Sequence, residues 1–295
     1  MMSLGASAVQ AEGNQVHANG VDIHYVEAGE GQPLVLLHGG VVSTSLIWEG
    51  VPIAYASHMG ALANNFRVIA PDTRGGGRTA HSGSEEVSFD VLADDVVALI
   101  DALGLERPLI TGFSEGAITA TIVAIRNPEA VRAVVNDAGF DAFDPDAPTV
   151  AMMRQILGGS PDATEPDPDA AARGFEASEQ MRPMLELMKH DQDSGQGAGH
   201  WRTYLRLAWD RTTQPPGYTY ADLAKITAPT LILVGDRDDF CTVEQAVTAY
   251  RQLPAGELAI LPNTGHVITP AAIETTIEFF ERQLACPSGS TSAAG

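Results

Sequence analysis

Short apolar runs alternate with amphipathic segments along most of this chain, and this alternation limits the folds that are open to it. Residues 33–40, for example, form a continuous apolar run that ends in glycines, which is typical of a strand buried on both faces. Strands that alternate with helices predict an α/β fold with a mostly parallel sheet and helices on both faces. The expected strands are residues 33–40, 66–72, 108–114, 131–137, 228–236 and 256–263, and the expected helices are residues 88–105, 115–128, 243–253 and 270–284.

Local signals add detail at the ends of these elements. Residues 16–29 read as a β-hairpin with Asn19-Gly20 as its two-residue turn. Ser88 is the expected N-cap of the helix that follows it, and Gly104 is its expected end. Ligands of open α/β sheets bind at the carboxyl ends of the strands, so we expect the functional residues there.

One long segment, residues 140–225, contains no apolar strand run and reads as a mainly helical insertion after the sixth strand. We therefore predict a core of residues 15–139 and 226–284, a helical cap or lid of residues 140–225, and disordered tails at 1–14 and 285–295. The apolar side chains of the insertion either pack it onto the core or line a pocket. They include Met152, Met153, Met181, Met184, Met188, Trp201, Tyr204 and Trp209.

Composition excludes several classes of partner. A formal net charge of −21 argues against nucleic acid and anionic lipid, because both attract positive protein surfaces. The two cysteines, Cys241 and Cys286, cannot build a disulfide framework or a zinc site, and they fit a reducing compartment. The first 15 residues lack the pattern of a signal peptide, and no apolar run is long enough to span a membrane. These features predict a cytoplasmic protein.

A possible nucleophile lies where an expected strand meets an expected helix. Residues 112–116 read G-x-S-x-G, which in this context predicts a nucleophile elbow with Ser114 exposed at the sharp turn. The alternative is an ordinary strand-to-helix turn with a capping serine. The start of the following helix favours negative charge beside it, as acyl-transfer chemistry requires.

A serine nucleophile needs a base and an acid that orients the base. Among eight histidines, His266 is the expected base because it follows the last strand at the carboxyl edge of the sheet. Asp238, after the strand 228–236, is the expected acid, because Asp236 directly abuts that strand and is expected to serve the local turn. Asp137, at the end of the strand 131–137, is the reserve candidate.

The oxyanion that forms during acyl transfer needs two backbone N–H donors. We expect one from Glu115, the residue after the nucleophile, and the other from Gly40 in the glycine-rich loop. Gly40 lets the backbone approach the substrate closely, and Val41 is the neighbour to consider.

Together these segments resemble the α/β-hydrolase superfamily over about residues 15–284. The motifs that carry the resemblance, in the order typical of that family, are "HGG" at 38–40, "PDTRGGGRT" at 71–79, "GFSEG" at 112–116, "LVGDRDD" at 233–239 and "NTGH" at 263–266. The chain is most similar to small cap-bearing serine hydrolases, which include valacyclovir-hydrolase-like esterases, lactonases and meta-cleavage carbon–carbon hydrolases. The resemblance implies the triad Ser114, Asp238 and His266, with no metal and no organic cofactor.

Three departures from the family pattern stand out. The family's R-G-x-G-x-S loop usually carries His in the middle, where this chain has Gly76, and it ends here in Thr79. Residues 48–66 are several residues longer than in relatives and start beside the oxyanion loop. Glu115 is an acid where many relatives have an uncharged residue, and its carboxylate is expected to be solvated or paired with an arginine. The other reading is that it contacts a cationic or hydroxyl-bearing substrate.

The leading prediction is a serine hydrolase that cleaves an ester or lactone of a small, largely apolar molecule. A carbon–carbon hydrolase or a cofactor-free perhydrolase with the same triad is the alternative, and a ligand receptor on a hydrolase scaffold is a third hypothesis. The expected partner is a small-molecule substrate, without nucleic acid or membrane, and a homodimer stays open. The candidate pocket residues are Val41, Trp48, Trp201, Trp209 and Val267.

Overall fold

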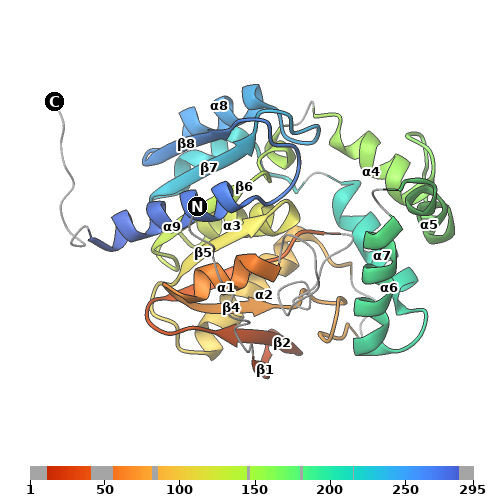
Figure 1. Ribbon diagram of the computed structural model, residues 1–295, viewed down its shortest axis with the longest axis horizontal. Helices are drawn as coiled ribbons and strands as arrows, with labels where there is room; N and C mark the ends of the chain where they lie inside the picture. The colour runs from red at the N-terminus through yellow and green to blue at the C-terminus, as the bar shows by residue number, and fades with distance from the viewer. Residues whose placement is uncertain are drawn as a thin grey trace, which may run out of the picture.

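An eight-stranded sheet forms the centre of the computed structural model, which describes residues 12–40, 56–81, 86–144, 147–179, 182–214 and 216–285 (Figure 1). The strand order is β1-β2-β4-β3-β5-β6-β7-β8; β1 pairs antiparallel with β2, and β2 with β4, whereas all other neighbours are parallel. The mostly parallel sheet predicted from the alternation is confirmed. The strands are β1 (Glu12–Ala18), β2 (Val21–Ala28), β3 (Pro33–Leu37), β4 (Arg67–Pro71), β5 (Leu109–Phe113), β6 (Ala133–Asp137), β7 (Thr230–Gly235) and β8 (Gly256–Leu261).

The predicted hairpin is confirmed, with one correction to its start. Asn19 and Gly20 both have positive φ angles, 47° and 75°, which is the backbone twist that a two-residue hairpin turn requires. β1 begins at Glu12, so residues 12–14 belong to the sheet and not to the tail that we predicted for 1–14. Tail prediction failed here because the polar residues of an edge strand carry no hydrophobic signal.

Helices cover both faces of the sheet (Figure 1). α1 packs against α9 on one face, and α2 packs against α3 on the other. Ser88 caps α2 as expected, because its Oγ accepts a hydrogen bond from Val91 N at 3.3 Å. Gly104 follows the end of that helix with a φ of 61°. The bounds are α1 (Ala56–Ala63), α2 (Phe89–Ala102), α3 (Glu115–Arg126), α8 (Val243–Gln252) and α9 (Pro270–Ala285).

In the described part of the chain, four α-helices lie between β6 and β7 and gather beyond one end of the sheet (Figure 1). They are α4 (Thr149–Gly158), α5 (Pro168–Ala177), α6 (Arg182–Gln196) and α7 (His200–Thr212). The insertion has an apolar cluster of its own, separate from the main core, although its division from the core as an independent domain stays a prediction. The cluster consists of Met153, Leu157, Ala171, Ala172, Phe175, Leu185, Met188, Trp201, Leu205, Ala208 and Trp209.

The insertion packs against the glycine-rich loop of residues 75–77. A Cβ atom on Gly76 would lie 2.8 Å from Tyr204 Cε2, so the tyrosine ring uses the space that a larger residue would fill. Gly77 N donates a hydrogen bond to Gln192 Oε1 at 2.8 Å. Gly76, where the family usually has a histidine, therefore leaves room for the bulky side chain of Tyr204 on α7.

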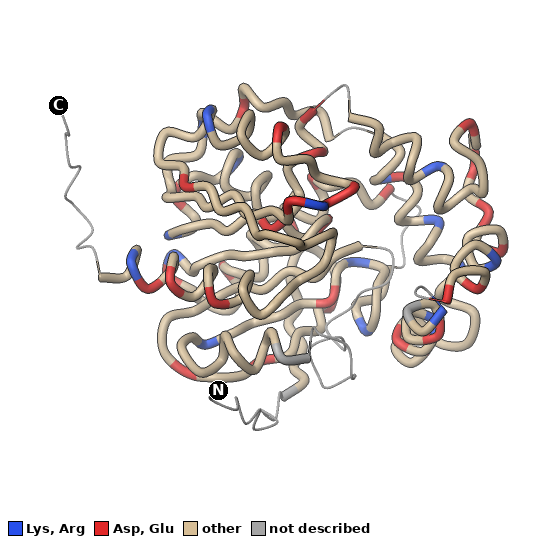
Figure 2. The backbone as a smooth tube through the Cα atoms, turned by 45° about the horizontal axis from the view of Figure 1, so that its top comes forward, with Lys and Arg blue, Asp and Glu red and all other residues tan. Residues whose placement is uncertain are grey.

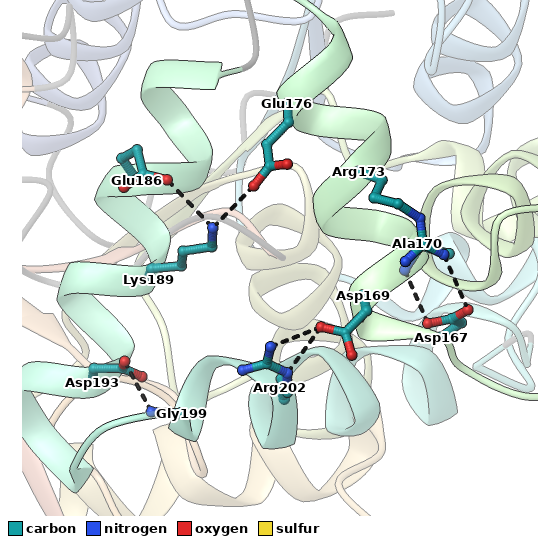
Figure 3. A network of polar contacts seen from close by, with 10 residues as sticks. All are labelled: Asp167, Asp169, Ala170, Arg173, Glu176, Glu186, Lys189, Asp193, Gly199 and Arg202. Atoms are coloured by element: carbon teal, nitrogen blue, oxygen red, sulfur yellow. Dashed lines mark hydrogen bonds and ion pairs between the residues drawn. The ribbon is translucent and has the colours of Figure 1, made fainter.

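Acidic residues outnumber basic ones in the core and in the insertion alike (Figure 2). On the insertion, several surface charges pair with each other, such as Arg202 with Asp169 and Lys189 with Glu176 and Glu186 (Figure 3). Within the described residues, no helix is long and apolar enough to cross a membrane.

Trp209→Ala is expected to lower the free energy of unfolding by about 3–5 kcal/mol, because it removes a large ring from the buried cluster of the insertion and leaves a cavity. Chemical denaturation of the purified variant measures the loss. Tyr250→Ala, at a side chain that is 38% exposed, is the control and should change stability much less. Equal stability of the Trp209 variant and the parent would show that the ring is not part of a packed core.

Candidate active site

Ser114 occupies a strained turn between β5 and α3. Its φ and ψ angles are 54° and −122°, a conformation that a residue with a side chain rarely adopts. A Cβ atom on Gly112 would lie 2.3 Å from the carbonyl carbon of Gly116, and one on Gly116 would lie 2.5 Å from Leu37 O. Only glycine fits on either side of the serine. The Ser114 side chain makes no capping hydrogen bond to α3, so the helix does not occupy its hydroxyl.

His266 and Asp238 form a close pair at the same edge of the sheet. His266 Nδ1 lies 2.9 Å from Asp238 Oδ2. Because a carboxylate accepts, Nδ1 is the donor and Nε2 is left as an acceptor. Asp238 Oδ1 accepts hydrogen bonds from the backbone N–H groups of Phe240 and Cys241, both at 2.8 Å. The Asp238 side chain is fully buried and firmly held, whereas the His266 side chain is 18% exposed.

Two aromatic rings pack against the imidazole of His266. The ring of Phe113 lies 4.7 Å from that of His266 between centroids, and the ring of Phe240 lies 4.6 Å from it. Phe113 directly precedes Ser114, so the imidazole lies beside the elbow. Phe240 also packs against the apolar cluster of the insertion, which links that cluster to His266.

The other candidate acids have different surroundings. Asp236 Oδ1 accepts a hydrogen bond from Thr264 N at 3.1 Å, which ties it to the local turn as we expected. Asp137 is buried at the end of β6, where burial and the charge of Asp238 hold its pKa well above the usual range. The carboxylate that contacts His266 is therefore that of Asp238, while the catalytic roles of all three residues stay predictions.

The glycine-rich loop after β3 lies against the elbow. A Cβ atom on Gly39 would lie 3.7 Å from Ser114 Cβ, and one on Gly40 would lie 1.7 Å from Glu115 Oε1. The two residues that we predicted as oxyanion donors, Gly40 and Glu115, are thus in contact. The contact is made by the side chain of Glu115, and the role of both N–H groups as oxyanion donors stays a prediction.

His38 links this loop to Thr73 by hydrogen bonds of its ring. Its Nδ1 lies 2.7 Å from Gly39 O, and its Nε2 lies 3.2 Å from Thr73 N. Thr73 N can only donate, so Nδ1 carries the proton and donates to Gly39 O. Burial lowers the pKa of His38, in agreement with a neutral ring that has one donor and one acceptor.

The carboxylate of Glu115 is paired with an arginine from the insertion. Arg211 Nε, on α7, lies 2.6 Å from Glu115 Oε2. Of the readings that the sequence left open, pairing with an arginine is confirmed. Sequence reasoning did not find Arg211, because a contact across 96 positions leaves no local pattern.

The candidate pocket residues lie in different places. Trp201 and Trp209 are buried in the apolar cluster of the insertion, at 5% and 7% exposure. Val267 is 40% exposed, next to His266. Val41 and Trp48 lie outside the described residues, as do Met181 and the side chain of Met184. The sequence analysis did not identify Phe113 and Phe240 as site residues. Phe113 could have been identified, because it directly precedes Ser114 in the G-x-S-x-G motif.

Comparison with known proteins identifies one family, whose similar members are named for different hydrolytic reactions. A family model described as alpha/beta hydrolase fold matches residues 32–270. The 2-hydroxymuconate semialdehyde hydrolase of Pseudomonas sp. (strain CF600) is 32% identical over 155 residues, which cover 49% of this chain and 53% of that protein. The soluble epoxide hydrolase of Corynebacterium sp. (strain C12) is 35% identical over 161 residues, which cover 50% of this chain and 51% of that protein.

These alignments span about half the length of the two curated relatives. A solved structure, the carboxylesterase CesB (YbfK) from Bacillus subtilis, superposes with a TM-score of 0.69 at 21% identity and covers 94% of this chain and 92% of that one. At this identity the likeness concerns the fold. The similar proteins act on different bonds, so they do not select a substrate.

Asp238→Asn is expected to lower kcat for ester hydrolysis by about 10⁴-fold. The amide oxygen would stay with the N–H groups of Phe240 and Cys241, so the NH₂ group would face His266 Nδ1, impose the wrong tautomer and leave the imidazolium without a negative partner. Hydrolysis of a p-nitrophenyl ester by the folded variant measures the loss. Asp236→Asn is the matched control in the same loop, since its amide oxygen can still accept from Thr264 N, and it should cost much less. A greater loss at Asp236 would move the acid to that residue.

Asp137→Asn is expected to change the pH dependence of stability and to leave kcat nearly intact. The raised pKa of Asp137 means that the folded state keeps a proton that the unfolded state loses. Its stabilising contribution is therefore present below the ordinary aspartate pKa and is lost as the pH rises toward the folded value. An asparagine mimics the protonated form at every pH, so the variant should gain stability relative to the parent as the pH rises above the ordinary aspartate pKa, as measured by urea unfolding over a pH series. A parallel pH profile would contradict a neutral Asp137.

Proposed function

We propose that this chain, which belongs to the alpha/beta hydrolase family, is a serine hydrolase that cleaves an ester or lactone bond of a small, largely apolar molecule. The observation that carries the proposal is the 2.9 Å pair of His266 and Asp238 beside the strained elbow of Ser114. A nucleophile in a forced conformation, next to an oriented base, is the arrangement that acyl transfer requires.

In the first step, Ser114 Oγ attacks the carbonyl carbon of the substrate and His266 Nε2 takes the hydroxyl proton. The electron pair of the C=O double bond moves onto oxygen, and the N–H groups of Glu115 and Gly40 stabilise this oxyanion. Asp238 remains ionised and stabilises the imidazolium of His266.

In the second step, the tetrahedral intermediate collapses and the bond to the leaving alcohol breaks. His266 gives its proton to the alcohol oxygen, and the acyl group stays on Ser114 as an ester. A water molecule then attacks this ester with His266 as the base, which releases the acid and restores the serine. In a lactone, the alcohol and the acid remain parts of one molecule.

An apolar substrate fits the surroundings of His266. Its ring packs against Phe113 and Phe240, and Phe240 also packs against the apolar cluster of the insertion. We propose that the insertion acts as a lid over Ser114, because the exclusion of water strengthens each electrostatic contact around an oxyanion. Short- to medium-chain esters, lactones and aromatic ring products suit such a lining better than sugars or peptides.

Carbon–carbon bond hydrolysis with the same triad is the second candidate. The similarity to a 2-hydroxymuconate semialdehyde hydrolase favours it. Epoxide hydrolysis is less well supported despite a similar identity, because epoxide hydrolases resemble this chain except that they place an aspartate where it has Ser114. A cofactor-free perhydrolase would use the same residues with peroxide in place of water.

The remaining parts of the proposal concern the setting of the reaction. The steps above use protein side chains, the substrate and water, and they call for no metal or organic cofactor. The buried free thiol of Cys241 fits a reducing compartment, and we keep a cytoplasmic location as part of the proposal. Neither a nucleic acid nor a membrane partner is proposed, and a homodimer stays open.

Ser114→Ala is expected to lower kcat for p-nitrophenyl ester hydrolysis by about 10⁴-fold or more while the protein still folds, because only one hydroxyl is lost. A fluorophosphonate probe should label the parent and leave the variant unlabelled. Ser194→Ala, at an exposed serine of α6, is the matched control and should be labelled as the parent is.

A panel of esters, lactones and ring-fission products then separates the two candidate reactions. Higher kcat/KM for ring-fission products than for every ester would replace the leading proposal by the second one. Equal labelling of the Ser114 variant at another serine would refute both.

A further inference from the structure

A buried ion pair connects the insertion to the nucleophile elbow. Arg211 of α7 and Glu115 at the start of α3 approach within 2.6 Å, and their side chains are 2% and 11% exposed. Arg211 Nη2 also donates a hydrogen bond to Tyr204 Oη at 3.3 Å. Tyr204 is the residue whose ring fills the space above Gly76, so the same face of α7 reaches both the glycine-rich loop and the elbow.

The position of the carboxylate matters more than the pairing alone. Glu115 Oε2 contacts Arg211, while Oε1 lies over Gly40, where it would be 1.7 Å from a Cβ atom. Glu115 Oε1 is buried and has no hydrogen-bond partner within the described part of the chain. A full negative charge therefore sits against one proposed oxyanion donor, Gly40, on the side chain of the other.

Such a charge opposes the reaction unless it is compensated. The oxyanion carries negative charge at the same donors, and two like charges repel strongly where little water screens them. A buried ion pair is also a poor source of stability, because the desolvation of both groups offsets most of their attraction. Burial alone would lower the pKa of Arg211, but Glu115 and Tyr204 raise it, so the guanidinium stays charged.

We infer that Arg211 is a positioning residue that acts through Glu115: it neutralises and holds the carboxylate beside the oxyanion donors, so that acyl transfer is efficient only while α7 is seated on the core. This inference rests on the proposed function. It gives the insertion a second role besides covering the substrate, since movement of α7 would uncover a negative charge next to the oxyanion.

The sign of the charge that each variant leaves behind makes the test specific. Arg211→Met leaves the Glu115 carboxylate unpaired, whereas Glu115→Gln leaves the Arg211 guanidinium unpaired. Both should lower the melting temperature, because each leaves one buried charge without its partner. Arg211→Met should lower kcat for a neutral ester by about 10–100-fold with KM nearly unchanged, because it leaves a negative charge that repels the oxyanion. Glu115→Gln leaves a positive charge instead, so its loss of kcat should be smaller than that of Arg211→Met by at least about fivefold.

The double variant Glu115→Gln/Arg211→Met removes both charges and should recover most of the lost kcat. Arg202→Met is the matched control: Arg202 lies on the same helix and pairs with Asp169 on the exposed face of the insertion (Figure 3). It should leave kcat unchanged. Steady-state kinetics on one p-nitrophenyl ester and thermal melts of all five proteins give the comparison.

Equal losses of kcat in Arg211→Met and Glu115→Gln, each in proportion to the loss in melting temperature, would show a purely structural pair and overturn the inference. A kcat of Arg211→Met equal to that of the parent would overturn it as well. Failure of the proposed function has a different signature, because the parent itself would then hydrolyse no ester and react with no fluorophosphonate.

Discussion

The close approach of the start of α3 to the end of β3 is the constraint on which the arrangement of the site depends. The backbone at Gly116 passes so near the carbonyl groups of Leu37 and His38 that no side chain fits between them. This contact forces the chain to turn sharply at Ser114, which explains its positive φ angle. It also fixes the glycine-rich loop after β3 directly beside the serine. The strained turn at the proposed nucleophile and the position of the loop with the proposed oxyanion donor are thus two results of one packing contact.

The parallel sheet then brings distant residues to the same edge. β5 and β7 both pair with β6, so the loops that follow them open on one side of the sheet. Asp238 reaches His266 there because its own loop supplies two backbone donors to the other carboxylate oxygen. The aromatic rings of Phe113 and Phe240 limit the rotation of the imidazole. The proposed base is therefore held by one hydrogen bond and two ring contacts, which come from the loop after β7 and from the end of β5.

Most of this framework was predictable from the sequence, because periodicity and turn residues report local structure. The strands, the Asn19-Gly20 turn and the cap of α2 follow from short patterns whose physical causes lie within a few residues. Residues 12–14 were assigned wrongly, since an edge strand in contact with solvent needs no apolar pattern. The helix α5 was not predicted either, because its Pro- and Asp-rich start reads as loop, although Asp167 caps it.

Polar contacts between residues far apart in the sequence could not be predicted, because no local pattern indicates them. Arg211 is one of several arginines in the insertion, and nothing local distinguishes it from Arg202, which pairs on the surface. The distinction comes from the face of α7 on which each residue lies, and that face is set by packing over the whole insertion. Asp238, the proposed acid, was easier to predict because the order of the family's motifs, together with the loop after β7, left few choices.

The packing of the insertion against residues 75–77 determines whether the insertion can be exchanged separately from the core. Gly76 makes room for Tyr204, and Gly77 is bonded to Gln192, so the loop of the core and the helices of the insertion fit each other in shape and in hydrogen bonding. An insertion taken from a relative with a histidine at position 76 would bring a helix shaped for a different loop. The two parts are therefore not independently exchangeable, and the unit that evolution or an engineer can swap is the insertion together with these three glycines.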